Sequence, residues 1–228
     1  MSGPAGKEEA ATALRVVGAG RETEATAMAR ARCYAAFSEL TASPHDVEVH
    51  AAVGDRLESD REVLPDALLA LLDELLATDD ETLKLGYSSL FEVGSEGPPA
   101  SIREDLFSGS KAGTREDLIR FYDFFGYRLG EHFAWAPDHL SLQLEFMHFL
   151  CYHEASDAGQ RLSWQLGQAD FAARHLVNWV PSLAARVESL EPGGFYARVL
   201  ATLADFLLAD LGWQDSTISS PAEESGDG

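Results

Sequence analysis

The sequence has few cysteines, no long apolar run and no export signal. Its two cysteines, Cys33 and Cys151, form no CxxC pair, which excludes a disulfide framework and a zinc knuckle. No apolar stretch approaches the ~18–20 residues of a membrane-spanning helix. The N-terminal residues lack a basic segment followed by an apolar one, so we expect no signal peptide. The sequence therefore predicts a cytoplasmic protein without membrane insertion.

Positive charge is also scarce. The 228 residues include 17 Lys and Arg against 38 Asp and Glu, for a formal net charge of −21. Nucleic-acid binding needs clustered basic side chains, so this charge argues against a nucleic-acid partner. Such an acidic surface suits a high-salt cytoplasm, where salt screens the repulsion between carboxylates. An ordinary acidic protein from a GC-rich genome is the alternative explanation.

Strand patterns are nearly absent, whereas apolar residues recur at helical spacing from about residue 22 to residue 213. This pattern predicts an all-α protein, a single bundle of about eight or nine helices. Residues 1–21 read as a flexible N-terminal arm, and residues 214–228 as a disordered acidic tail. Two long loops, residues 94–113 and 126–138, interrupt the bundle, and loops of this length are often functional.

The chain contains none of the short catalytic or nucleotide-binding motifs, and its histidines do not form a metal site. Four of the seven histidines lie between His132 and His153. On one helix, His148 and Cys151 would lie within about 60° of each other, but His153 would lie about 140° from His148. Three ligands for one ion are therefore not available from this helix. We expect no metal site and no cofactor.

The segment APDHLSLQLEFMHFL, residues 136–150, combines polar and apolar character. Apolar residues surround the helix axis from Leu140 to Cys151, so this helix should be central to the bundle. Its start places Asp138 and His139 at the rim of an apolar scaffold. An acid beside apolar walls suits a ligand that is both basic and apolar, such as a peptide. The alternative is an ordinary helix start, where Asp138 faces unpaired N–H groups and nothing is bound.

Several segments, in the same order, resemble the TorD/DmsD/NarJ family, the dedicated chaperones of molybdopterin-dependent oxidoreductases. They are YSSLFEVGSEGPPASIREDLF (87–107), REDLIRFYDFFGY (115–127), PDHLSLQLEFMHFL (137–150) and QADFAARHLVNWVPSLAARVESLEPGGFYARVLATLADFL (168–207). The resemblance covers about residues 25 to 211. The LEFM motif and the FYDFFG segment are most similar to the family branch that serves dimethylsulfide, ethylbenzene, selenate and chlorate enzymes.

The resemblance implies a TorD-like, cytoplasmic protein, monomeric or homodimeric, that is not an enzyme. Its implied partner is the immature catalytic subunit of a molybdopterin oxidoreductase, together with that subunit's twin-arginine leader peptide. It would assist cofactor insertion and delay export. The implied peptide-binding residues are Tyr87, Leu90, Phe91, Asp138 and His139.

Other readings of the same residues stay open. Tyr87, Leu90 and Phe91 occur at i, i+3 and i+4, so they share one helix face, and core packing is the alternative role, especially for Leu90. A small hydrolase-like helical enzyme could instead use Asp138 and His139. A helical adaptor would bind the mature subunit without binding the leader.

Overall fold

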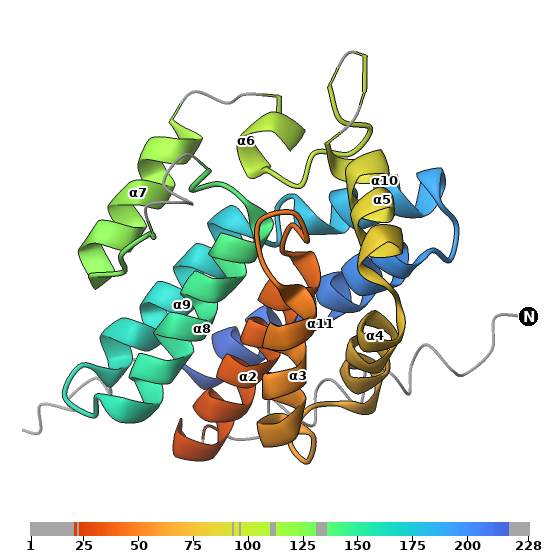
Figure 1. The fold of residues 1–228 in the computed structure, drawn as a ribbon. Coiled ribbons are helices and arrows are strands. Elements are labelled where there is room, and N and C mark those ends of the chain that lie inside the picture. The colour runs from red at the N-terminus through yellow and green to blue at the C-terminus, as the bar shows by residue number, and fades with distance from the viewer. Residues whose placement is uncertain are drawn as a thin grey trace, which may run out of the picture.

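The computed structural model describes residues 21–218 except 22, 93, 96, 110–112 and 131–135. In this part of the chain every regular element is a helix, and β-structure is limited to isolated bridges (Figure 1). The predicted all-α fold is confirmed. Nearly all of the predicted N-terminal arm and residues 219–228 of the predicted tail lie outside the described residues.

Ten helices occupy the described residues. They are α2 (Thr23–Thr41), α3 (Val49–Asp60), α4 (Asp66–Ala77), α5 (Asp80–Phe91), α6 (Glu104–Phe107), α7 (Thr114–Phe125), α8 (Leu140–Ser156), α9 (Arg161–His175), α10 (Val180–Leu190) and α11 (Phe195–Thr217).

One helix boundary is marked by a proline, and another differs from the prediction. A break after His175 separates α9 from α10, and Pro181 lies in the first turn of α10. Proline is tolerated there because its missing N–H has no intrahelical partner in any case. At the other end of the chain, α11 continues to Thr217, four residues into the segment predicted as a tail.

Helix α8 is central, as its apolar residues predict. It packs along α2 and lies beside α9 (Figure 1). Its buried apolar residues are Leu140, Leu142, Leu144, Phe146, Met147, Leu150 and Cys151. Because its apolar residues surround the helix axis, α8 is stabilised by contacts with other helices on several sides.

The first long loop connects α5 to α7 and packs against both the end of α5 and the start of α8. The backbone N–H of Ala100 donates to the carbonyl of Leu90 at 2.9 Å, and that of Leu140 donates to Ile102 at 3.1 Å. The N–H of Glu104 donates to the carbonyl of Asp138 at 3.0 Å. These bonds hold residues 98–107, which we call the groove wall, against the segment that begins α8. The one-turn helix α6 belongs to this wall.

Candidate functional site

A groove of about 640 Å³ lies between α2 and α3 on one side and α5, the groove wall and the start of α8 on the other. This volume is within the range of ligand pockets, roughly 300–1,000 Å³. Its surface is mainly apolar, with contributions from Ala35, Val49, Phe91, Ile102, Ala136 and Leu142. Its polar lining includes Ser38, Glu39, Asp46, Arg56, Arg103, His139, Ser141, Glu145 and His148. The groove can therefore bury apolar side chains beside charged groups.

The three predicted residues of α5 belong to the core, and two of them also reach the groove. Tyr87 and Phe91 line the groove but are only 1% and 5% exposed. Their ring centroids are 5.0 Å apart, and the ring of Tyr196 packs edge-on against both. Leu90 is buried outside the groove lining, as the core-packing alternative predicts. Contact with a ligand through α5 is therefore limited to the edges of two aromatic rings.

Asp138 is fully buried and faces the groove wall rather than the groove. Its Oδ1 accepts from Nη2 of Arg103 at 2.8 Å and from Nε of Arg103 at 3.2 Å. Its Oδ2 accepts from the backbone N–H of Asp105 at 3.3 Å, and Nε of Arg115 lies 3.8 Å from Oδ1. The guanidinium of Arg103, itself a groove-lining group, thus occupies the place beside Asp138 where the sequence predicts a basic group of the ligand.

His139 is the N-cap residue of α8 and supports Tyr87. Its Nδ1 accepts from the backbone N–H of Ser141 at 3.2 Å and lies 2.8 Å from the Ser141 hydroxyl. This contact places the imidazole proton on Nε2, which therefore donates to the Tyr87 hydroxyl at 2.9 Å. Burial, and then the positive charge of Arg103, lower the pKa of His139 to about 4. The ring is therefore neutral at pH 7, and both of its nitrogens are already bonded.

Two carboxylates of the groove make no ion pair with another described residue. The other two have partners: Glu39 lies 2.6 Å from Arg56, and Glu92 lies 3.6 Å from Nε2 of His45. By contrast, Asp46, in the loop after α2, and Glu145, on α8, are exposed and make no ion pair with another described residue. An exposed arginine or lysine of a ligand would find unpaired negative charge at these two positions.

The histidines of α8 and their neighbour Cys151 have separate partners. His148 Nδ1 lies 2.9 Å from the carbonyl of Ala31, and the Cys151 thiol contacts Gln168. The ring of His153 stacks on that of Trp164 at 4.7 Å. No group of three or more potential metal ligands occurs among the residues that the structure describes. His132, the fourth histidine of this region, lies outside the described residues.

Several residues that line the groove were not predicted from the sequence. Arg103 precedes Asp138 by 35 positions, and no spacing rule connects them. Their contact depends on the isolated bridge that pairs the backbones of Arg103 and His139. Asp46 lies in a short connection with no motif of its own. The one available signal was the length of the loop at residues 94–113, which marked that region, without its individual residues, as functional.

Among the described helices, none has the length and apolar character that a bilayer-spanning segment needs.

Comparison with known proteins gives consistent matches. Residues 57–185 match the family described as nitrate reductase delta subunit. The chlorate reductase assembly chaperone protein of Ideonella dechloratans is 33% identical over 132 residues, which cover 56% of this chain and 67% of that protein. The selenate reductase assembly chaperone protein of Thauera selenatis is 32% identical over 147 residues, which cover 60% and 75% of the two chains.

A solved structure shares the fold. The crystal structure of a candidate redox enzyme maturation protein from Archaeoglobus fulgidus aligns with a TM-score of 0.52 over 78% of this chain and 93% of that chain. The two sequences are 21% identical, so this likeness concerns the arrangement of helices alone.

Proposed function

Because the chain belongs to the TorD/NarJ family, whose nitrate reductase delta subunit model matches more than half of it, we propose that it is a dedicated assembly chaperone. Its client is the immature catalytic subunit of a molybdopterin oxidoreductase, and it binds the twin-arginine leader of that subunit. Binding keeps the client available for cofactor insertion and delays its export. The relatives named as assembly chaperones of chlorate and selenate reductases support this proposal.

The groove is the observation that carries the leader-binding part of the proposal. A twin-arginine leader has two guanidinium groups and an apolar stretch, and the groove offers apolar surface together with two unpaired carboxylates. We assign the arginines to Asp46 and Glu145, which are exposed at the groove. The apolar stretch contacts Ala35, Phe91 and Leu142. Burial of one large apolar side chain contributes roughly 1.5–3 kcal/mol, so two or three such contacts suit micromolar affinity.

The five residues named from the sequence divide into two roles in this proposal. Tyr87, Phe91 and His139 line the groove and can touch the peptide. Leu90 and Asp138 lie behind the lining and act indirectly. Asp138 holds the guanidinium of Arg103 in place, and Arg103 in turn forms part of the groove surface.

A hydrolase that uses Asp138 and His139 is less well supported. A general base at pH 7 needs a pKa near the working pH, whereas the pKa of His139 is lowered to about 4. The Asp138 carboxylate is engaged by Arg103 and does not orient the imidazole. The Ser141 hydroxyl lies 2.8 Å from His139 Nδ1, an arrangement that the capping of α8 accounts for by itself.

Calorimetric titration tests the proposal. A synthetic peptide with the sequence of the client's leader is added to the purified chain, and the heat of binding is measured. We expect saturable micromolar binding that weakens when both leader arginines are changed to lysine, because lysine cannot make bidentate contacts. The substitution Ala35→Trp should fill the groove and abolish binding, whereas Leu208→Trp, at an exposed position of α11, should not. Binding to the mature subunit without any binding to the leader would favour an adaptor and contradict the leader proposal.

A further inference from the structure

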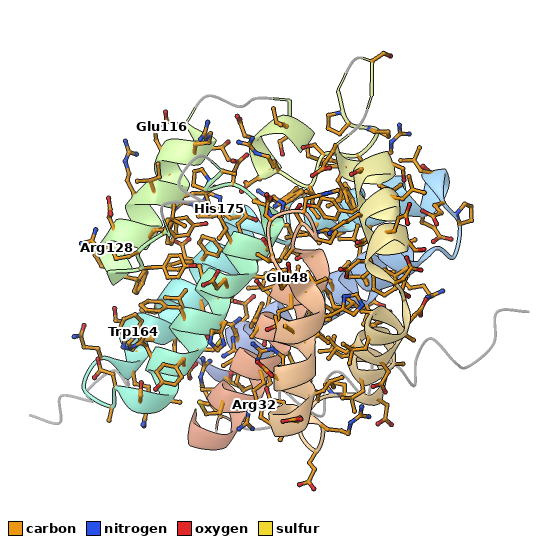
Figure 2. The ribbon with its side chains drawn as sticks, viewed as in Figure 1. Arg32, Glu48, Glu116, Arg128, Trp164 and His175 are labelled. Atoms are coloured by element: carbon orange, nitrogen blue, oxygen red, sulfur yellow. The ribbon has the colours of Figure 1, made fainter. Side chains whose placement is uncertain are left out.

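A buried polar cluster lies directly behind the groove wall. Glu104, at the start of α6, is 5% exposed, although an isolated glutamate is costly to bury. Gln143 of α8 is 0% exposed, and His175 at the end of α9 is 4% exposed. Figure 2 shows His175 in the interior, between α7 and the pair formed by α8 and α9. None of the three residues lines the groove.

Short contacts join Gln143 and His175 to the carboxylate of Glu104. Gln143 Nε2 donates to Oε2 of Glu104 at 2.6 Å. His175 Nδ1 lies 3.1 Å from the same oxygen and 3.3 Å from Oε1. On the opposite edge of the imidazole, Nε2 lies 3.4 Å from a carboxylate oxygen of Asp117, a residue of α7 that also pairs with Arg174. Glu104 thus connects the groove wall to α8 and α9.

The groove wall has little regular structure of its own to fix its position. Helix α6 is one turn of four residues, far shorter than a helix that is stable in isolation. The position of the wall therefore depends on what attaches it to the bundle. Backbone hydrogen bonds and the apolar side chains of Ala100, Ile102 and Phe107 supply part of this attachment. The side-chain polar contacts supply the rest: Arg103 to Asp138 on the groove side, and Glu104 to Gln143 and His175 on the far side.

We propose that Glu104, Gln143 and His175 are positioning residues for the groove. They set the place of Arg103, Ile102 and Leu106, three of the wall residues that line it, without touching the bound peptide. The part of this inference that concerns peptide affinity rests on the proposed leader binding. The part that concerns the wall does not, because the order of residues 98–107 can be measured without any partner.

The experiment uses the full-length chain and two variants. Glu104→Ala removes the shared carboxylate. Tyr34→Phe is the matched control, because it removes one buried hydrogen bond, to Asp210, at the opposite end of α8. Hydrogen exchange is followed at amides that donate within or from the wall, namely those of Ala100, Glu104 and Phe107, and leader affinity is measured per folded molecule.

We expect exchange at these amides to rise at least tenfold in Glu104→Ala and leader affinity to fall about fivefold. Tyr34→Phe should change neither quantity beyond its effect on global unfolding. The exchanged pair Glu104→Gln with Gln143→Glu keeps one carboxylate and one amide at this position, so it should restore most of the protection. If Glu104→Ala does not fold, the isosteric Glu104→Gln is judged by the same criteria.

Unchanged exchange in the wall, or a rise equal to that of Tyr34→Phe, would overturn the positioning role. Loss of wall protection with unchanged leader affinity would overturn its link to binding. If the unmodified chain binds no leader at all, the proposed function fails, and the exchange data still decide whether the cluster positions the wall.

Discussion

Two buried polar networks lie at opposite ends of α8, and they join different kinds of structure. The first network consists of Arg21, Arg30, Tyr34, Glu154 and Asp210. Arg30 forms bidentate hydrogen bonds with Asp210 at 2.6 and 3.0 Å and a third with Glu154 at 3.2 Å. Arg21 donates to Glu154 at 2.9 Å, and the Tyr34 hydroxyl donates to Asp210 at 2.7 Å. Two arginines thus face two carboxylates between long helices.

The second network, behind the groove, consists of Arg103, Glu104, Asp138, Gln143 and His175. It attaches a wall made largely of loop to the start of α8 and the end of α9. Its arginine is less enclosed: the Arg103 side chain is 20% exposed, whereas that of Arg30 is 0% exposed. Water can therefore reach part of the second network but none of the central pairs of the first.

The difference shows that buried charge has two uses in one molecule. In the first network, helices that already pack through apolar faces enclose the charges completely, so loss of one partner leaves an uncompensated charge in the core. In the second network, polar contacts add to the apolar packing of Ala100, Ile102 and Phe107, which by itself is small for a wall made largely of loop. Damage to the first should therefore lower global stability, and damage to the second should act mainly on the groove.

Arg30→Met should have the largest effect. It leaves the carboxylate of Asp210 buried without its arginine, so the free energy of unfolding should fall by about 3–5 kcal/mol. Urea denaturation followed by circular dichroism measures this change. Arg32→Met is the matched control, because Arg32 is a 34% exposed neighbour paired with Asp60, and it should cost less than about 1 kcal/mol. Equal losses in the two variants would contradict the distinction between the networks.

A pH series on His139→Asn should give the next largest effect. The folded chain holds the pKa of His139 at about 4, below its usual value of about 6.5. Between these values the unfolded chain binds a proton that the folded chain does not. Stability is therefore fully present above pH 6.5 and is lost as the pH falls towards 4, by on the order of 3 kcal/mol.

The asparagine in this variant keeps a good N-cap for α8 but does not titrate. The unmodified chain should therefore lose more stability than His139→Asn between pH 6.5 and 4 when both are followed by urea denaturation. His148, whose pKa burial also lowers, is present in both proteins and cancels in the difference. Parallel stability curves for the two proteins would mean that His139 does not resist protonation.

A double-mutant cycle tests whether Asp138, in the second network, acts on the leader through Arg103. Asp138→Asn removes the charge that holds Arg103, so leader affinity should fall roughly tenfold, equivalent to ~1.4 kcal/mol, with the fold retained. In combination with Arg103→Met the two losses should not add, because both remove the same contact. Calorimetric titration of the four proteins gives the coupling. Strong coupling of Asp138 to the leader arginines instead would show that Asp138 contacts the peptide directly.

The smallest effect is expected at the groove surface. Glu145→Gln removes one exposed charge, so leader affinity should fall about threefold at physiological salt, where the screening length is ≈ 8 Å. In ~1 M salt, with a screening length of about 3 Å, the difference should vanish. Glu116→Gln, on the outer side of α7 (Figure 2), should have no effect at either salt concentration. A loss for Glu145→Gln that persists in molar salt would place that carboxylate in a sheltered contact.

The helices were predictable because their signals are local. The apolar residues of α8 surround its axis, and such a helix must be central. The continuation of α11 to Thr217 was not predicted, because residues 214–217 are all polar and adjoin the acidic tail. The groove was predictable only in part: the motifs identified Tyr87, Phe91 and His139, but the pairing of Asp138 was not visible in them.

The sequence alone determined that the chain is helical, acidic and built around one helix whose apolar residues surround its axis, since periodicity and composition act over neighbouring residues. It also determined which motifs are present. The tertiary structure decided what each polar residue of those motifs faces. Asp138 binds Arg103 and not the groove because the wall, 35 positions earlier in the chain, folds back onto the start of α8. Contacts of this kind depend on how loops and helices meet in space, and no local pattern records them.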